Sequence, residues 1–158
     1  MKTTVAVLVL LLSIPQNARA ERGRESLRGL TAVVFSVHSY GSKSQPVLLG
    51  VDGDLRRAGL RLLSADDDPN GRVPRLDLDL TLACSGRSCG YTVRLQLTQR
   101  VRLSRRPDIE DTATTWADGY QNGIGESDLP GLMDLYDARS RALVKSFLDD
   151  YRSANPTR

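Results

Sequence analysis

An acidic turn in the first half of the sequence has the residue types and spacing of a metal-binding loop. Asp66, Asp68, Asn70 and Gly71 reproduce the D-x-D-x-N-G opening of an EF-hand-type calcium loop, and Asp77 takes its twelfth position. However, Asp replaces the usual bidentate Glu, a proline lies inside the loop, and the flanking segments have strand patterns rather than helical ones. Because an Asp-Pro-Asn-Gly string is also a good β-turn, a plain turn is the favoured interpretation and a structural calcium site is the alternative.

A second group of residues could form a binding surface. Arg94, Arg100 and Arg102 alternate along one segment and therefore share one face of a strand. Trp116 and Tyr120 have matching parity on a later segment, and face either these arginines or the core. Arginines beside aromatic rings would form a platform for an anionic glycan, a lipid head group or a peptide. The favoured alternative is a solvated face, with Trp116 buried under a helix.

Signals of catalysis are weak. His38 is the only histidine, so a cluster of metal-binding histidines cannot form. The sequence also contains no G-x-S-x-G elbow to place a nucleophile. We therefore expect a protein that is not an enzyme, and a hydrolase built around His38 is the third hypothesis.

The chain begins like a protein with a cleavable signal peptide. Lys2 precedes an apolar run at 5–12, and residues 18–20 read A-x-A, which predicts cleavage after Ala20. The run is too short to cross a bilayer, and no later segment is apolar enough to do so. We expect an exported protein, periplasmic or extracellular, without a transmembrane segment in the mature chain.

The charge of the mature chain is close to neutral. The full sequence has 22 basic and 19 acidic residues, a net charge of +3. Removing Lys2 and Arg19 leaves 20 basic and 19 acidic residues, a net charge of +1. This balance does not indicate nucleic-acid binding.

The spacing of apolar residues predicts the element order β-α-β-β-β-β-α. The first three elements form a β-α-β unit. A charged loop is predicted at 105–111, and a Gly-rich loop before Ile124. The predicted strands lie at 31–39, 60–64, 75–84, 91–105 and from Thr112, and the predicted helices at 47–58 and from the Ser127-Asp128 cap to about Ala154.

The two cysteines fix the register of the predicted central hairpin. An even cysteine count in an exported protein favours a disulfide between Cys84 and Cys89. If these residues face one another, every apolar residue of one strand meets an apolar residue of the other. On the opposite face Asp79 meets Arg94, an oppositely charged pair. A slip of one residue would place leucines against polar residues.

These patterns predict an α+β fold, a two-layer sandwich. Each helix has one apolar stripe and the hairpin has one apolar face, so we expect a mixed, mostly antiparallel sheet with both helices on one face. The predicted organisation is a signal peptide at 1–20, a flexible N-terminus at 21–29, one domain at 30–155 and a tail at 156–158.

Three segments carry a resemblance to known proteins: GYTVRLQLTQRV, TATTWADGY and FLDDYRSAN. Together they resemble a group of exported bacterial proteins of unknown function, and this resemblance implies no activity. The order of elements is similar to small periplasmic α/β sandwiches of envelope-assembly machines, such as the LPS-assembly lipoprotein or the N-terminal domain of TolB. That similarity implies a fold and not a function, and this chain lacks the lipid-anchor cysteine of the former.

The leading hypothesis is a non-enzymatic exported domain without a cofactor. It would bind an envelope component or a protein partner through its polar sheet face. The alternative is an exported domain with a structural calcium ion in the 66–77 loop.

Overall fold

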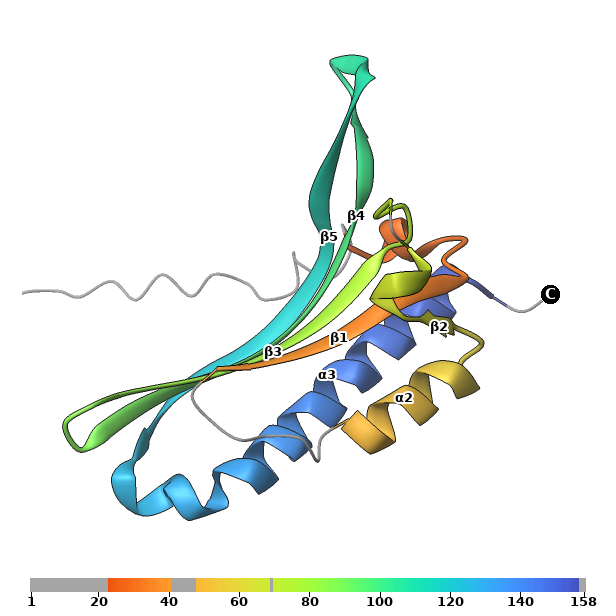
Figure 1. The fold of residues 1–158 in the computed structure, drawn as a ribbon. Coiled ribbons are helices and arrows are strands. Elements are labelled where there is room, and N and C mark those ends of the chain that lie inside the picture. Colours follow the sequence, from red (N-terminus) through yellow and green to blue (C-terminus); the bar gives the residue numbers. More distant parts are fainter. Residues whose placement is uncertain (1–22, 41–47, 69, 157–158) are drawn as a thin grey trace, which may run out of the picture.

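A five-stranded sheet with two helices on one face forms the protein (Figure 1). The computed structural model describes residues 23–40, 48–68 and 70–156. The strands are β1 (Ala32–Tyr40), β2 (Arg61–Leu63), β3 (Arg75–Ser85), β4 (Ser88–Leu103) and β5 (Arg106–Gly125). The helices are α2 (Leu48–Arg57) and α3 (Leu132–Ala154), and three 3-10 turns are η2 (Glu25–Leu27), η3 (Ala65–Asp67) and η4 (Glu126–Gly131).

The sheet is mixed, with the order β2-β1-β3-β4-β5. β1 runs parallel to both β2 and β3, whereas β3, β4 and β5 are joined as antiparallel neighbours. Both helices cover the same face (Figure 1). The predicted α+β sandwich and its element order are therefore confirmed. Because three strands are parallel, all three begin at the same end of the sheet.

Alternating side chains of the central strands form the core. Three leucines of β3 are fully buried and pack with α3, whose Tyr136, Leu143 and Phe147 are also fully buried. Successive side chains of a strand point to opposite faces, so the residues between these leucines point away from the helices. The buried leucines are Leu76, Leu78 and Leu80 on β3 and Leu95 and Leu97 on β4.

The hairpin formed by β3 and β4 has the predicted register. Asp79 pairs with Arg94, and Cys84 pairs with Cys89 and forms a disulfide with it. Pairing continues one residue further than predicted, which leaves a two-residue turn at 86–87. Gly86 has a φ of 60°, as the first central residue of a type II′ turn requires.

The predictions for the segment after β4 were wrong. In place of the charged loop at 105–111 and the Gly-rich loop before Ile124, one strand, β5, runs over 20 residues, and 16 of them pair with β4. Proline and glycine gave this segment the appearance of a loop, but Gly119 lies in the ladder, where a Cβ atom would be 3.0 Å from the Val93 carbonyl oxygen. Beyond the last β3 pair, at Thr98, both strands continue as a two-stranded arm, residues 99–113, which bends away from the helices (Figure 1).

The last helix starts later than predicted. Residues 126–131 form η4, and the N-cap of α3 is Gly131, without a side-chain cap, rather than Ser127-Asp128. Pro130 lies inside η4, and a proline disfavours the α conformation of the residue before it. The predicted end of the helix near Ala154 is confirmed, with Asn155 as the C-cap.

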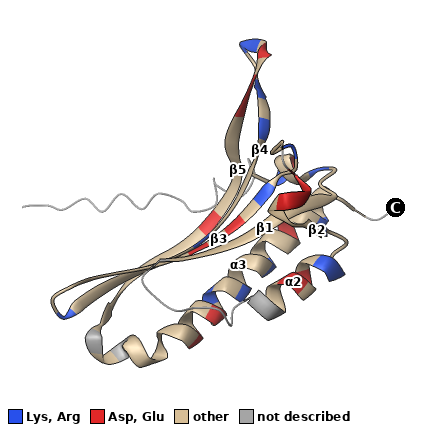
Figure 2. Cartoon of the chain, viewed as in Figure 1, with Lys and Arg blue, Asp and Glu red and all other residues tan. Residues whose placement is uncertain are grey.

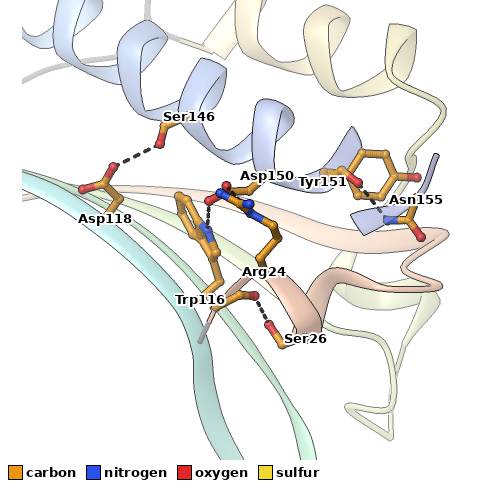
Figure 3. A network of polar contacts seen from close by, with 9 residues as sticks. Arg24, Ser26, Trp116, Asp118, Ser146, Asp150, Tyr151 and Asn155 are labelled. Atoms are coloured by element: carbon orange, nitrogen blue, oxygen red, sulfur yellow. Dashed lines mark hydrogen bonds and ion pairs between the residues drawn. The ribbon is translucent and has the colours of Figure 1, made fainter. Parts of the chain in front are cut away.

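The N-terminal segment is part of the domain from Gly23 onward, which differs from the predicted flexible 21–29. Leu27 of η2 is fully buried. Arg24 binds Asp150 of α3 at 3.1 Å, and the same carboxylate accepts a hydrogen bond of 3.0 Å from Trp116 Nε1 (Figure 3). Asn155 donates to the Leu27 carbonyl group at 2.8 Å. These contacts hold the start of the domain against its last helix.

Candidate functional site

The sheet face opposite the helices is polar, and we call it the open face. It consists of the side chains that alternate with the buried residues of β1, β3 and β4. No helix covers it in the part of the chain that the structure describes (Figure 1). Its members include Ser36, His38, Asp77, Asp79, Thr81, Thr92, Arg94 and Gln96.

One row of the open face carries a histidine, an acidic and a basic residue on three neighbouring strands. His38 on β1 pairs with Asp79 on β3, which pairs with Arg94 on β4. His38 Nε2 also lies 3.4 Å from Oδ1 of Asp77, whose side chain is 14% exposed. The row ends at Gly119 on β5, opposite Arg94. Rigid strands therefore place an imidazole, two carboxylates and a guanidinium within one patch.

The three arginines expected on this surface have different surroundings. Arg94 is exposed and forms no ion pair with the described residues. Arg100 and Arg102 lie on the arm, where both contact Glu110, at 3.8 and 3.0 Å. Basic and acidic residues lie together along the arm (Figure 2). Glu110 lies in the segment that was predicted to be a loop, so its contacts with two of the arginines were not expected.

The two aromatic residues considered for the surface lie on the helix side of the sheet. Trp116 is 5% exposed and packs edge-to-face against Phe147 of α3. Tyr120 packs against the core, and the guanidinium of Arg139 lies 4.6 Å from its ring centroid. The platform of aromatic rings beside Arg94 is therefore not formed, and the alternative, Trp116 under a helix, is the one observed.

The residues of the calcium hypothesis are distributed over several elements. Asp66 belongs to η3, and Asp77 lies on β3 next to His38. Asp68 accepts hydrogen bonds from the backbone N–H groups of Arg72 and Val73, at 2.9 and 2.8 Å. Among the residues that the structure describes, no group of three or more His, Cys, Asp or Glu side chains could hold a metal ion. The observed hydrogen bonds are those of a closed turn, and the proposed ligand Asn70 lies at its tip.

His38 has the carboxylate neighbour that a catalytic base would need. Asp77 could orient its ring, as the acidic member of a triad does. A triad also needs a nucleophile within hydrogen-bond reach of the histidine, and the side-chain contact recorded for His38 is the one to Asp77. The hydrolase hypothesis stays a prediction.

A pocket lined by arginines was not predicted from the sequence. It has a volume of about 320 Å³ and includes Arg28, Arg61 and Arg72, and we call it the arginine pocket. The rest of its wall comes from Ser26, residues 29–32, Val73, Pro74 and Gln99. Arg28 precedes β1, Arg61 begins β2, and Arg72 precedes β3. Because these three strands are parallel neighbours, the segments that lead into them meet at one end of the sheet. Arginines lie at or shortly before the starts of these strands, but this pattern indicates a pocket only once the three strands are known to be parallel neighbours.

Hydrogen bonds hold the walls of the arginine pocket. The Gly29 N–H group, at a φ of 76°, donates to Asn155 Oδ1 at 2.7 Å. Val34 N–H donates to the Pro74 carbonyl group at 2.9 Å, and Arg61 N–H donates to the Thr31 carbonyl group at 3.0 Å. The backbone from which the arginines extend is therefore fixed.

Comparison with known proteins identifies no relative. No protein-family model matches the chain, and no curated protein sequence matches it. No helix in the described ranges is both long and apolar enough to cross a membrane. A function must therefore be argued from the chain's own surfaces.

Proposed function

We propose that this protein is an exported, non-enzymatic binding domain that recognises an envelope component through the open face. The observation that carries the proposal is the charged row across β1, β3 and β4, on a sheet face that no helix of the described residues covers. Opposite charges on neighbouring strands stabilise the sheet, and on an uncovered face they also hold polar groups in a fixed array that a ligand can contact. Here the side chains of His38, Asp79 and Arg94 lie next to one another on three paired strands of the sheet.

The disulfide supports the export part of the proposal. Disulfides persist in oxidising compartments and are rare in the cytosol, and Cys84 and Cys89 are bonded. The start of the sequence has the three parts of a signal peptide. Mass spectrometry of the mature protein should find an N-terminus at Glu21 and no free thiol. A retained leader, or two free thiols, would contradict export.

Photo-crosslinking tests the open face. A benzoylphenylalanine at Thr92, on the open face, should form a discrete crosslinked product in intact envelopes. The same probe at Lys145, on the exposed side of α3, is the matched control and should not. Arg94→Gln should remove the Thr92 product, because it deletes the positive charge of the row. Glutamine is chosen because it places no carboxylate opposite Asp79.

Folding of the Arg94→Gln variant is checked by its free energy of unfolding, which should stay within about 0.5 kcal/mol of wild type, as is usual at exposed sites. Identical products from Thr92 and Lys145 would show that the contact is not specific to the open face. An unchanged product in Arg94→Gln would refute the role of the charged row.

A further inference from the structure

We propose that the arginine pocket is a second binding site, which takes a phosphate group of an anionic ligand. The site lies at the amino ends of β1, β2 and β3 and does not depend on the open-face proposal. The argument rests on the donors that meet in the pocket, on their charge balance and on the rigidity of the walls.

The donors are of the kind that recognises phosphate. Each guanidinium is always charged and presents N–H groups in a planar fork, which matches two oxygens of a phosphate. Arg28, Arg61 and Arg72 come from three different segments and line one concavity. Three guanidinium groups around a tetrahedral anion can each donate hydrogen bonds to a different oxygen atom. A single arginine on a flat surface can contact only one side of the anion.

The charges of the pocket are not balanced by the protein. Arg24, Arg57, Arg100, Arg102, Arg106, Arg141 and Arg152 each contact a carboxylate. Among the described residues no such contact occurs for the three arginines of the pocket. Like charges in one concavity repel one another, and an anion would relieve that repulsion.

Acidic residues of the turn before Arg72 are engaged within that turn. Both oxygens of Asp68 accept backbone N–H groups. Asp67 accepts from the Ser64 backbone N–H and hydroxyl groups, at 3.0 and 2.8 Å. The acidic turn η3 is visible as the red segment near β2 (Figure 2). The carboxylate contacts described for this turn hold the turn together and do not reach the guanidinium groups of the three arginines.

The walls of the pocket need no rearrangement to bind. The loops that carry Arg28 and Arg72 are fixed by hydrogen bonds to Asn155 and Asp68, and Arg61 extends from a paired strand. A fixed backbone reduces the entropy that binding costs, because only the three arginine side chains must then be ordered.

Thermal unfolding in phosphate tests the proposal. A ligand that binds only the folded state raises the Tm. Inorganic phosphate at ~10 mM, compared with chloride at equal ionic strength, should raise the Tm of wild type by about 3 °C. Arg61→Gln and Arg72→Gln should each weaken phosphate binding about tenfold by calorimetric titration, as expected when a charged hydrogen-bond donor is removed.

The matched control is Arg87→Gln, in the turn at the opposite end of the β3–β4 hairpin. It removes one positive charge and should leave the phosphate effect unchanged. If Arg87→Gln and Arg61→Gln weaken phosphate binding equally, the binding depends only on the net charge of the protein, and the proposal is overturned. Native emission from Trp116 shows that each variant is folded.

Vesicles distinguish a lipid phosphate from a soluble one. If the protein sediments with phosphatidylglycerol vesicles but not with phosphatidylcholine vesicles, the phosphate group belongs to a lipid head group. In that case Arg61→Gln and Arg72→Gln should reduce the amount of protein that sediments. A Tm shift in phosphate without vesicle binding would identify a soluble phosphorylated ligand. If wild type responds to neither inorganic phosphate nor phosphatidylglycerol vesicles, the site does not exist. Arg94→Gln should affect none of these measurements, so this proposal and that of the open face can fail separately.

Discussion

Tyr136 joins the last helix to the sheet through one hydroxyl group. The residue is fully buried, and its hydroxyl donates to the Thr81 carbonyl group at 2.9 Å. Tyr136→Phe should lower the free energy of unfolding by about 1 kcal/mol, because the carbonyl group loses its donor. Urea unfolding followed by the emission of Trp116, the only tryptophan, measures this change.

Tyr120→Phe is the matched control for Tyr136. Its ring keeps the contact with Arg139, and its hydroxyl forms no recorded hydrogen bond with the described residues, so stability should not change. Burial raises the pKa of Tyr136 above its usual 10.0. The folded state therefore favours the protonated phenol, and the stability that this provides is lost as the pH rises above 10.0. Equal effects of the two substitutions would contradict the role of the Tyr136 hydroxyl.

At the scale of elements, η3 is closed by a capping box. Hydrogen bonds from the side chain and backbone of Ser64 lower the pKa of Asp67 below its usual 3.8. A lowered pKa means that the contribution to stability is present above pH 3.8 and is lost as the pH falls through the lower, folded-state value. Ser64→Ala should therefore be less stable than wild type at pH 7.

The difference in Tm between Ser64→Ala and wild type should become smaller in acid, because Asp67 becomes protonated. Thermal unfolding across this range measures it, with Ser153→Ala on the exposed end of α3 as the control. A difference that is constant from pH 7 to pH 2 would show that the carboxylate is not the partner of Ser64.

The arm is an element that the core does not support. Leu103 and Ile109 are 41% and 37% exposed, and its ion pairs are exposed and contribute little. Arg100 and Thr112 are paired, so an Asn-Gly turn can join them in place of residues 101–111. This deletion should change the free energy of unfolding by less than about 1 kcal/mol, since a lone two-stranded ribbon is marginal. A loss of several kcal/mol in urea unfolding would show that the arm supports the core.

The elements differ in how far the sequence could predict them. The β3–β4 hairpin was predictable because its leucines, charges and cysteines all agree on one register. β5 was predictable only in part, from Thr112, because Pro107 and Gly119 are typical of loops. Gly119 pairs with Arg94 in the ladder, and Pro107 lies where the pairing with β4 is irregular. The open face was predictable, because polar and apolar residues alternate along the strand that carries Arg94. The arginine pocket could not be predicted, because it depends on which strands are parallel neighbours, and distant residues such as Arg28 and Arg72 meet only in the assembled sheet.

On the scale of the whole molecule, Asp150 links three distant parts of the chain. It binds Arg24 before the first strand and Trp116 on β5 (Figure 3). Asp150→Ala should lower the free energy of unfolding by about 2 kcal/mol, because it leaves the buried indole N–H group without an acceptor. The emission of Trp116 should also shift to longer wavelength in the folded variant.

The adjacent residue provides the control. Asp149 is half exposed and contacts only Lys145 and Arg152 among the described residues, so Asp149→Ala should cost less than about 0.5 kcal/mol. Similar losses for Asp149→Ala and Asp150→Ala in the same urea titration would show that the link through Trp116 contributes nothing.

The contacts between η2 and α3 also set the order in which the molecule can be made. A growing chain that has released all five strands but not the final helix has no Tyr136 or Phe147 to close its core, and no Asn155 to hold the entry to β1. The apolar face of the sheet therefore stays exposed until α3 has been released and can pack on it.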